Sequence, residues 1–158
     1  GSALDLGAGP GTQAMELARR GFTVTASDIS AAAVRLASQK AQKQGLEITW
    51  KHDDILDTRL DRQFDLIFDR GCFHVLAPER REDYVRIVSG LLKKGGYLFL
   101  KIFSRLEPGE QGPYRFTHEQ IREIFGSRLS VLAIKDTVYQ GTLDPLPRAL
   151  FCTIRNRT

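Results

Sequence analysis

Short apolar segments alternate with longer amphipathic ones along most of the 158-residue chain. The amphipathic segments begin near Thr12, Ser30 and Pro78, and Gly21, Gly45 and Gly95 are predicted to end the corresponding helices. The apolar segments are predicted as strands at residues 3–6, 22–27, 46–51, 64–68 and 97–103. This alternation favours a mostly parallel sheet with helices on both faces.

The last third of the chain follows a different pattern. Thr117 and Gln120 form a capping box for a helix that runs through Phe125. Residues 129–136 and 148–155 are then predicted as two strands with no helix between them. A parallel crossover needs about a dozen residues or more, usually a helix, so this last pair is expected to be antiparallel. Residues 1–158 are therefore predicted as one α/β, Rossmann-like domain.

Composition narrows the functional classes. Hydrophobic residues make up 42% of the chain and charged residues 27%, and the net charge is +4. The basic residues are dispersed rather than clustered, which argues against nucleic-acid binding. No apolar run approaches the ~20 residues of a membrane helix, and no signal peptide is evident, so no membrane partner and a cytoplasmic location are expected. Two cysteines, Cys72 and Cys152, make neither a disulfide framework nor a metal site.

Three glycines follow the first predicted strand, in the stretch LDLGAGPGT at residues 4–12. Such a loop lets backbone approach a nucleotide closely, because no side chain intervenes. The dinucleotide spacing G-x-G-x-x-G requires a glycine at position 12, but this chain has Thr12 there and its third glycine at Gly11. A dinucleotide, S-adenosylmethionine and a plain tight turn are the three interpretations, and the spacing disfavours the first.

Acidic residues lie at or near the ends of the first three predicted strands. Asp5 would repel a pyrophosphate but suits a ligand with an ammonium group, although it is also placed to receive glycine N–H groups. Asp28 is suited to accept both hydroxyls of a ribose. Asp54, for which Asp53 is the rival, is suited to accept the amine of adenine, with the N–H of Ile55 on the ring. Together these acids match a nucleoside with a cationic tail.

The segments LDLGAGPGT, ASDIS, DDIL, FDLIFDRGCFH and LLKKGGYLFL resemble those of class I S-adenosylmethionine-dependent methyltransferases. The resemblance covers essentially the whole chain. Residues 69–73 (DRGCF) and 112–126 are also similar to the thiopurine methyltransferase-like group. The resemblance implies a seven-stranded sheet of order 3-2-1-4-5-7-6 with strand seven antiparallel, and S-adenosylmethionine as cofactor. The implied cofactor-binding residues are Asp5, Gly7, Ala8, Gly9, Gly11, Asp28, Ile29, Asp54, Ile55 and Asp69.

The segment DRGCFHVL at residues 69–76 is expected to lie beside the transferred methyl group. It lacks the Asn/Asp-Pro-Pro-aromatic motif of amino-methylating enzymes and the Pro-Cys nucleophile of cytosine C5 enzymes. Both absences favour a small-molecule acceptor, and a soft sulfur nucleophile is slightly preferred because it needs only a pocket and a cation for in-line displacement.

Several side chains near the expected methyl site have two interpretations each. His74 is a candidate general base or a packing residue, and Arg70 either attracts an anionic substrate or forms a structural ion pair, which is the preferred interpretation. Cys72 is interpreted as an inert buried thiol. Tyr114 and Arg115, in the loop after the fifth strand, are candidates for the acceptor pocket or anchors of that loop.

The thiopurine methyltransferase-like group has an N-terminal segment that closes over the acceptor. This sequence begins almost directly on its first strand, so that segment is expected to be lacking. Methyl transfer to a small molecule is the leading functional hypothesis. The alternative is a scaffold or sensor that binds the cofactor without turnover, and a nicotinamide oxidoreductase is disfavoured by the missing third glycine.

Overall fold

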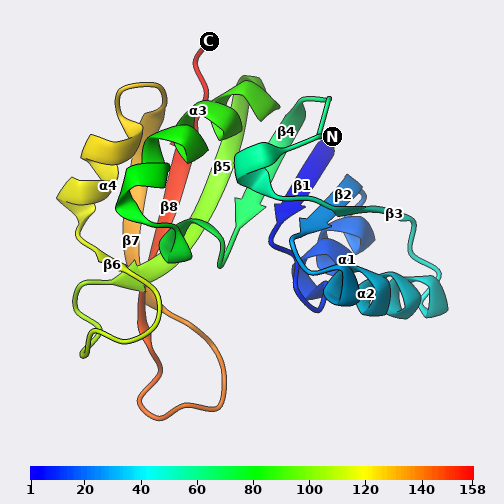
Figure 1. Ribbon diagram of the computed structural model, residues 1–158, viewed down its shortest axis with the longest axis horizontal. Helices are drawn as coiled ribbons and strands as arrows, with labels where there is room; N and C mark the ends of the chain where they lie inside the picture. The colour runs from blue at the N-terminus through cyan, green and yellow to red at the C-terminus, as the bar shows by residue number, and fades with distance from the viewer.

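Eight strands of the computed structural model, which describes residues 1–158, form one twisted sheet (Figure 1). Its order is β3-β2-β1-β4-β5-β8-β7, with the short β6 paired to β5. The strands are β1 (Ser2–Leu6), β2 (Thr23–Asp28), β3 (Ile48–His52), β4 (Phe64–Asp69), β5 (Leu92–Ser104), β6 (Arg115–Phe116), β7 (Ser130–Val138) and β8 (Arg148–Arg155). Only β8 is antiparallel to its neighbours, so the predicted fold class is confirmed, and so is the predicted order once β6 is set aside.

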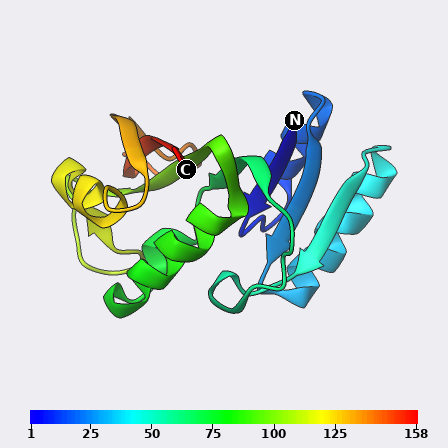
Figure 2. The same ribbon diagram turned by 90° about the horizontal axis from the view of Figure 1, so that it is seen from above.

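Four α-helices connect or cover the strands: α1 (Thr12–Arg19), α2 (Ala31–Lys43), α3 (Arg81–Leu91) and α4 (His118–Phe125). α1 and α2 contact the half of the sheet that contains β1, β2 and β3, whereas α3 and α4 contact β5 and β7. Figure 2 shows α3 and α4 on the same side of β5 and β8. Because parallel crossovers are right-handed, the reversal of strand order between β1 and β4 sends the two helix pairs to opposite faces.

The sequence pattern misplaced two boundaries. Gly95 does not end the third helix, which stops at Leu91; Leu92 already belongs to β5 and pairs with Phe64. Pro78 opens a single 3-10 turn before α3 rather than α3 itself. Thr12 is the first residue of α1, whose N-cap is Gly11, and no side chain caps that end. In contrast, the predicted capping box at Thr117 and Gln120 is present.

The main core lies between the sheet and helices α3 and α4. Leu98, Leu100 and Ile102 of β5 are fully buried in it, together with the aromatic rings of Phe73, Tyr84 and Phe125. The ring of Phe73 packs at a tilt against those of Tyr84 and Phe125, with centroid distances of 4.9 Å and 5.1 Å. Because Phe73 comes directly after the loop that follows β4, this packing fixes that loop against the core.

Candidate functional site

Two cavities lie side by side at the carboxyl ends of β1, β2 and β4, where the strand order reverses. One, of about 270 Å3, is lined by Leu6, Gly7, Ser27, Asp28, Ile29, Asp53, Asp54, Ile55, Gly71, Cys72, Val75 and Leu76. The other, of about 290 Å3, is lined by Asp5, Gly7, Ala8, Gly9, Pro10, Thr12, Gln13, Arg70, Gly71 and Tyr139. We call them the acidic cavity and the glycine-loop cavity. Gly7 and Gly71 border both, so one elongated ligand can span the two.

The carboxylate of Asp28, at the end of β2, holds the glycine loop. It accepts the backbone N–H of Gly9 at 2.9 Å and that of Ser30 at 2.9 Å. The side chain is only half-buried, so it remains accessible from the acidic cavity. Asp28 therefore links the loop that borders one cavity to the wall of the other.

Asp53 and Asp54, the two rivals for an adenine ligand, differ in what their carboxylates contact. Asp53 accepts the hydroxyl of Thr58 at 2.7 Å and the N–H of Arg59 at 2.9 Å, which occupies both of its oxygens. Asp54 is exposed and caps a single 3-10 turn, Ile55–Asp57, through one oxygen that accepts the N–H of Leu56. The second oxygen of Asp54 accepts no hydrogen bond within the protein, which favours Asp54 as the ligand.

Asp5 is the most unusual group in the site. It is 2% exposed, and its Oδ2 atom is buried without a hydrogen-bond partner. Burial, assisted by the negative charge of Asp69, raises the pKa of Asp5 to about 7. A buried carboxylate oxygen without a donor is costly. Since Asp5 borders the glycine-loop cavity, a cationic or N–H donor group bound there would satisfy it.

Asp69, at the end of β4, serves the protein rather than a ligand. Its carboxylate accepts the N–H groups of Gly71, Cys72 and Phe73 and the hydroxyl of Tyr84, the last at 2.5 Å. The side chain is fully buried, and burial raises its pKa. The prediction of Asp69 as a cofactor ligand is therefore corrected: its side chain shapes the loop that carries Gly71 and Cys72 to the cavities.

Two glycines of the loop have distinct physical roles. Gly9 has φ +52°, and a β-carbon added there would meet no protein atom within 4 Å, so the space beside it is free for a ligand. Gly11 has φ +82°, and a β-carbon there would lie 2.8 Å from the indole of Trp50 and 3.2 Å from Ala37. Gly9 thus leaves room for a ligand, whereas Gly11 lets α1 pack against α2 and β3.

His74 does not have the geometry of a general base. Its side chain is 6% exposed, and burial lowers its pKa to about 4. The Nδ1 atom lies 3.3 Å from the backbone nitrogen of Phe103 and accepts its N–H. In the neutral ring, the proton then sits on Nε2, which leaves no free lone pair for a substrate proton. The geometry favours the packing interpretation.

Arg70 forms no ion pair, contrary to the preferred interpretation of the sequence. None of the ion pairs within 4.0 Å involves Arg70 or the nearby Lys101. Instead, both cations lie beside the ring of Tyr139, with distances to its centroid of 5.8 Å for the Arg70 guanidinium carbon and 4.9 Å for Lys101 Nζ. Arg70 and Tyr139 both line the glycine-loop cavity.

Tyr114 and Arg115 lie outside both cavities. Arg115 donates to the carbonyl oxygens of Glu107, Pro108, Gln111 and Pro113, and so folds its own loop. The N–H of Tyr114 donates to the carbonyl oxygen of His74 at 2.8 Å, and its ring lies against Arg81. The prediction that these two residues line an acceptor pocket is replaced by the loop-anchoring alternative.

The family profile described as "Methyltransferase domain" matches residues 3–96, which is more than half of the chain and includes both the glycine loop and the segment after β4. The chain belongs to this methyltransferase family. S-adenosylmethionine is the cofactor of the family.

Individual relatives differ in the acceptor that their names state. The chain is 31% identical over 128 residues to the 2-heptyl-1-hydroxyquinolin-4(1H)-one methyltransferase of Mycobacteroides abscessus, an alignment that covers 78% of this chain and 56% of the relative. It is 35% identical over 109 residues to human EEF1A lysine methyltransferase 2, covering 63% of this chain and 46% of the relative. The chain thus spans about half the length of these two relatives.

The fold is also found in solved structures. The structure of Burkholderia thailandensis 1,6-didemethyltoxoflavin-N1-methyltransferase, with its substrate and S-adenosylhomocysteine bound, superimposes with a TM-score of 0.83. Sequence identity is 22%, and the match covers 99% of this chain and 71% of the other. At that identity, the likeness establishes the fold of the methyltransferase and nothing about its acceptor.

Sequence reasoning did not single out several residues in or beside the two cavities. Val75 and Leu76 give the acidic cavity an apolar wall, and Val75 is exposed. Tyr139, which follows β7, lines the glycine-loop cavity, and Lys101 of β5 lies beside the Tyr139 ring outside both cavities. The adjacent apolar residues Val75 and Leu76 are a signal from which the sequence could have indicated this wall. No local sequence signal marks Tyr139 or Lys101 as part of the site.

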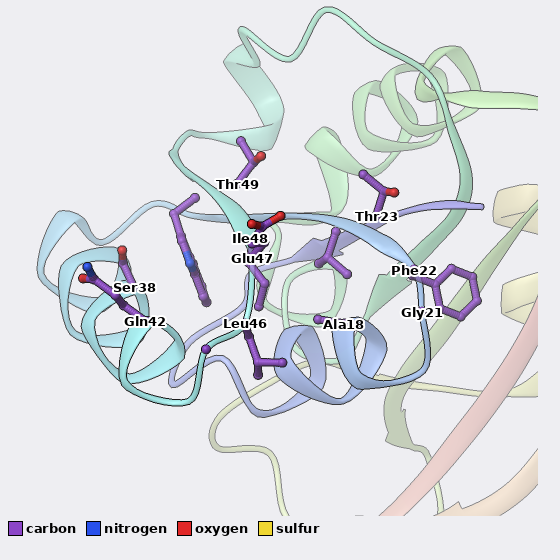
Figure 3. Close-up of a pocket in the computed structure, with 13 residues that line it drawn as sticks. Ala18, Gly21, Phe22, Thr23, Ser38, Gln42, Leu46, Glu47, Ile48 and Thr49 are labelled. Atoms are coloured by element: carbon purple, nitrogen blue, oxygen red, sulfur yellow. The ribbon is translucent and has the colours of Figure 1, made fainter.

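A more voluminous hollow of the domain lies elsewhere. An open groove of about 900 Å3 is lined by α1, α2 and the beginnings of β2 and β3, including Ala18, Leu46 and Ile48 (Figure 3). It lies toward the amino ends of the strands, opposite to the edge where parallel sheets bind ligands. It contains Glu47 as its only acid, so it does not compete with the two cavities as a nucleoside site. None of the helices has the length and apolar character that a membrane span requires.

The two glycine roles predict different effects of the same substitution. Gly9→Ala is expected to cost only the strain of a positive φ, about 1–2 kcal/mol of folding free energy. Gly11→Ala adds a clash with Trp50 to the same strain, and so should lower stability by clearly more. Urea unfolding of both variants checks this, and equal losses would show that Trp50 yields without cost.

The raised pKa of Asp5 predicts a pH-dependent gain in stability for Asp5→Asn. The folded state holds the Asp5 proton up to about pH 7, so the wild type loses stability as pH rises from the ordinary carboxyl pKa through that value. The amide carries no charge, so the variant should be stabilised by roughly 2 kcal/mol more at pH 8 than at pH 5.

Urea unfolding at the two pH values measures this difference. Asp61→Asn, which removes an exposed acid, is the matched control and should show almost no pH-dependent change. An Asp5→Asn effect that is the same at pH 5 and pH 8 would contradict the assignment of Asp5 as a buried, charge-destabilised carboxyl.

Proposed function

We propose that this domain binds S-adenosylmethionine across the two cavities and transfers its methyl group to a small-molecule acceptor by in-line displacement. The observation that carries the proposal is the unpartnered Oδ2 of Asp5, a residue that lines the glycine-loop cavity together with Gly9. A buried anion beside a loop with free space is an arrangement suited to a ligand that brings a positive charge.

The residues present fit the cofactor along its whole length. Asp5 and the loop Gly7–Gly11 would hold the methionine part, in which the ammonium supplies the missing donor. Asp28 would accept the ribose hydroxyls, and the free oxygen of Asp54 would accept the amine of adenine between Ile29 and Ile55. When bound, S-adenosylmethionine supplies a methyl group on a positively charged sulfur, which is a strong electrophile.

The protein contributes position and electrostatics to such a transfer. Holding an acceptor atom in line with the methyl group supplies several kcal/mol of the barrier without acid or base chemistry. Because His74 is buried and its Nδ1 is occupied, an acceptor that is already ionised is favoured over one that must lose a proton during reaction. A soft sulfur nucleophile fits this requirement, since thiols ionise at moderate pH.

Activity is tested by release of S-adenosylhomocysteine in the presence of a panel of thiols and N-hydroxy heterocycles. The panel includes an N-hydroxyquinolone because the name of the relative from Mycobacteroides abscessus states such a substrate. Turnover of any member supports the proposal. Tight cofactor binding without turnover of any acceptor would instead favour the scaffold or sensor alternative.

Asp28→Ala is expected to weaken S-adenosylhomocysteine binding by on the order of 2–3 kcal/mol, because a charged acceptor for two hydroxyls is lost. Calorimetric titration measures the change, and thermal unfolding verifies that the variant is folded. Asp57→Ala, an exposed acid near the acidic cavity, is the control and should bind normally. Unchanged affinity in Asp28→Ala would exclude the ribose assignment.

His74→Ala is expected to lower stability by roughly 2–4 kcal/mol, as for other buried large-to-small changes, and to reduce kcat/KM by a similar factor for every acceptor. A thiol series of graded pKa separates packing from base catalysis. A general base would instead give a loss of about 10²-fold confined to acceptors that are protonated at the assay pH. His118→Ala, at an exposed ring, serves as the control.

A further inference from the structure

Two cations without acidic partners flank one aromatic ring at the mouth of the glycine-loop cavity. Arg70 follows β4, Lys101 is on β5 and Tyr139 follows β7, so three separate segments converge there. No side-chain hydrogen bond or ion pair within the protein uses the guanidinium of Arg70 or the ammonium of Lys101. Their donor groups are therefore free for a ligand.

The ring between these cations is held in place by backbone contacts. The hydroxyl of Tyr139 lies 2.8 Å from the carbonyl oxygen of Lys101 and 3.0 Å from that of Arg70, within donating distance of both. The N–H of Tyr139 donates to the carbonyl oxygen of Pro147 and closes the loop between β7 and β8. That loop hangs beyond the carboxyl edge of the sheet in Figure 1. The ring beside the two cations is thus fixed by hydrogen bonds to the backbone of three segments.

The two cations also repel each other, and neither forms an ion pair with a carboxylate. Burial, with a contribution from the charge of Arg70, lowers the pKa of Lys101. Like charges beside one ring, with no carboxylate between them, cost free energy in the free protein. An anion bound between them would remove that cost and gain two charge-assisted hydrogen bonds.

We propose that Arg70, Lys101 and Tyr139 form an anion subsite that selects acceptors carrying a carboxylate or a similar organic acid group. The proposal rests on the proposed function, since the subsite adjoins the glycine-loop cavity through Arg70 and Tyr139. The acid group would sit between the two cations and the aromatic part of the acceptor against Tyr139. The same charges disfavour the ammonium side chain of a protein lysine.

The test is a calorimetric comparison of two matched probes, 2-mercaptobenzoate and its neutral methyl ester. Each is titrated into the protein alone and into protein saturated with S-adenosylhomocysteine. The acid is expected to bind at least about tenfold more tightly than the ester, and this preference should shrink as salt rises, because screening weakens charge interactions.

Lys101→Gln separates the subsite from the cofactor cavities, which Lys101 does not line. This variant is expected to lose most of the preference for the acid while its affinity for S-adenosylhomocysteine stays within about twofold of the wild type. Arg70→Gln should reduce the preference as well. Lys94→Gln, at an exposed position near the start of the same strand, is the matched control and should keep it.

Equal binding of acid and ester to the wild type, or binding of neither, would overturn the anion subsite. So would a loss in Lys94→Gln as large as that in Lys101→Gln, because the effect would then be one of net charge. Failure of the protein to bind S-adenosylhomocysteine would instead defeat the proposed function, and the titrations of the protein alone would still decide whether the anion subsite exists.

Discussion

The unsatisfied carboxylate of Asp5 is the constraint around which the site is arranged. A side chain that is 2% exposed, with one oxygen lacking any donor, persists only because the neighbouring strands force it there. Asp5 pairs in register with Ala26 of β2 and Phe68 of β4, both in the interior of the sheet. The reversal of strand order beside β1 leaves space above Asp5 in place of a crossover helix. The topology thus supplies both the buried carboxyl group and the cavity beside it.

Asp69 shows how the same residue type serves a different purpose one strand away. Its carboxylate receives four donors, and three of them are successive N–H groups of the loop after β4. That loop carries Gly71 between the two cavities and then inserts Phe73 into the main core. Asp69, whose carboxylate accepts four hydrogen bonds, therefore fixes the loop between the two cavities. Asp5, which has one oxygen without a donor, lines the cavity proposed to hold the ligand. Their mutual repulsion contributes to the raised pKa of Asp5.

The sequence predicts the parts of this structure whose signals are local. Strand order, the antiparallel last pair and the capping box at Thr117 follow from periodicity, loop length and motif resemblance. The role of Asp69 did not follow, because its donors include Tyr84, fifteen positions away. The sequence leaves Arg115 as either a pocket residue or a loop anchor for the same reason, because its hydrogen bonds to four carbonyl groups are visible only in the folded loop. Strand β5 begins at Leu92, before the predicted start at residue 97, because Leu92 pairs with Phe64. This pairing outweighs the tendency of the glycines at 95–96 to interrupt a strand.

The site combines side chains of both charge signs, and this combination suits the proposed reaction. Asp5, Asp28 and Asp54 line the cavities that would hold a sulfonium nucleoside, whereas Arg70, at one wall of the glycine-loop cavity, and Lys101 lie beside the ring of Tyr139. Methyl transfer from a sulfonium to an anionic nucleophile leaves two neutral atoms, so charge disappears along the reaction coordinate. Exclusion of water favours such a step. The two charged reactants lose their hydration, whereas the transition state, in which the charges partly cancel, depends less on hydration. The task of the protein is then to bring a cationic cofactor and an anionic acceptor together. The acids at the strand ends suit the cofactor, and the cations beside the ring of Tyr139 suit the acceptor.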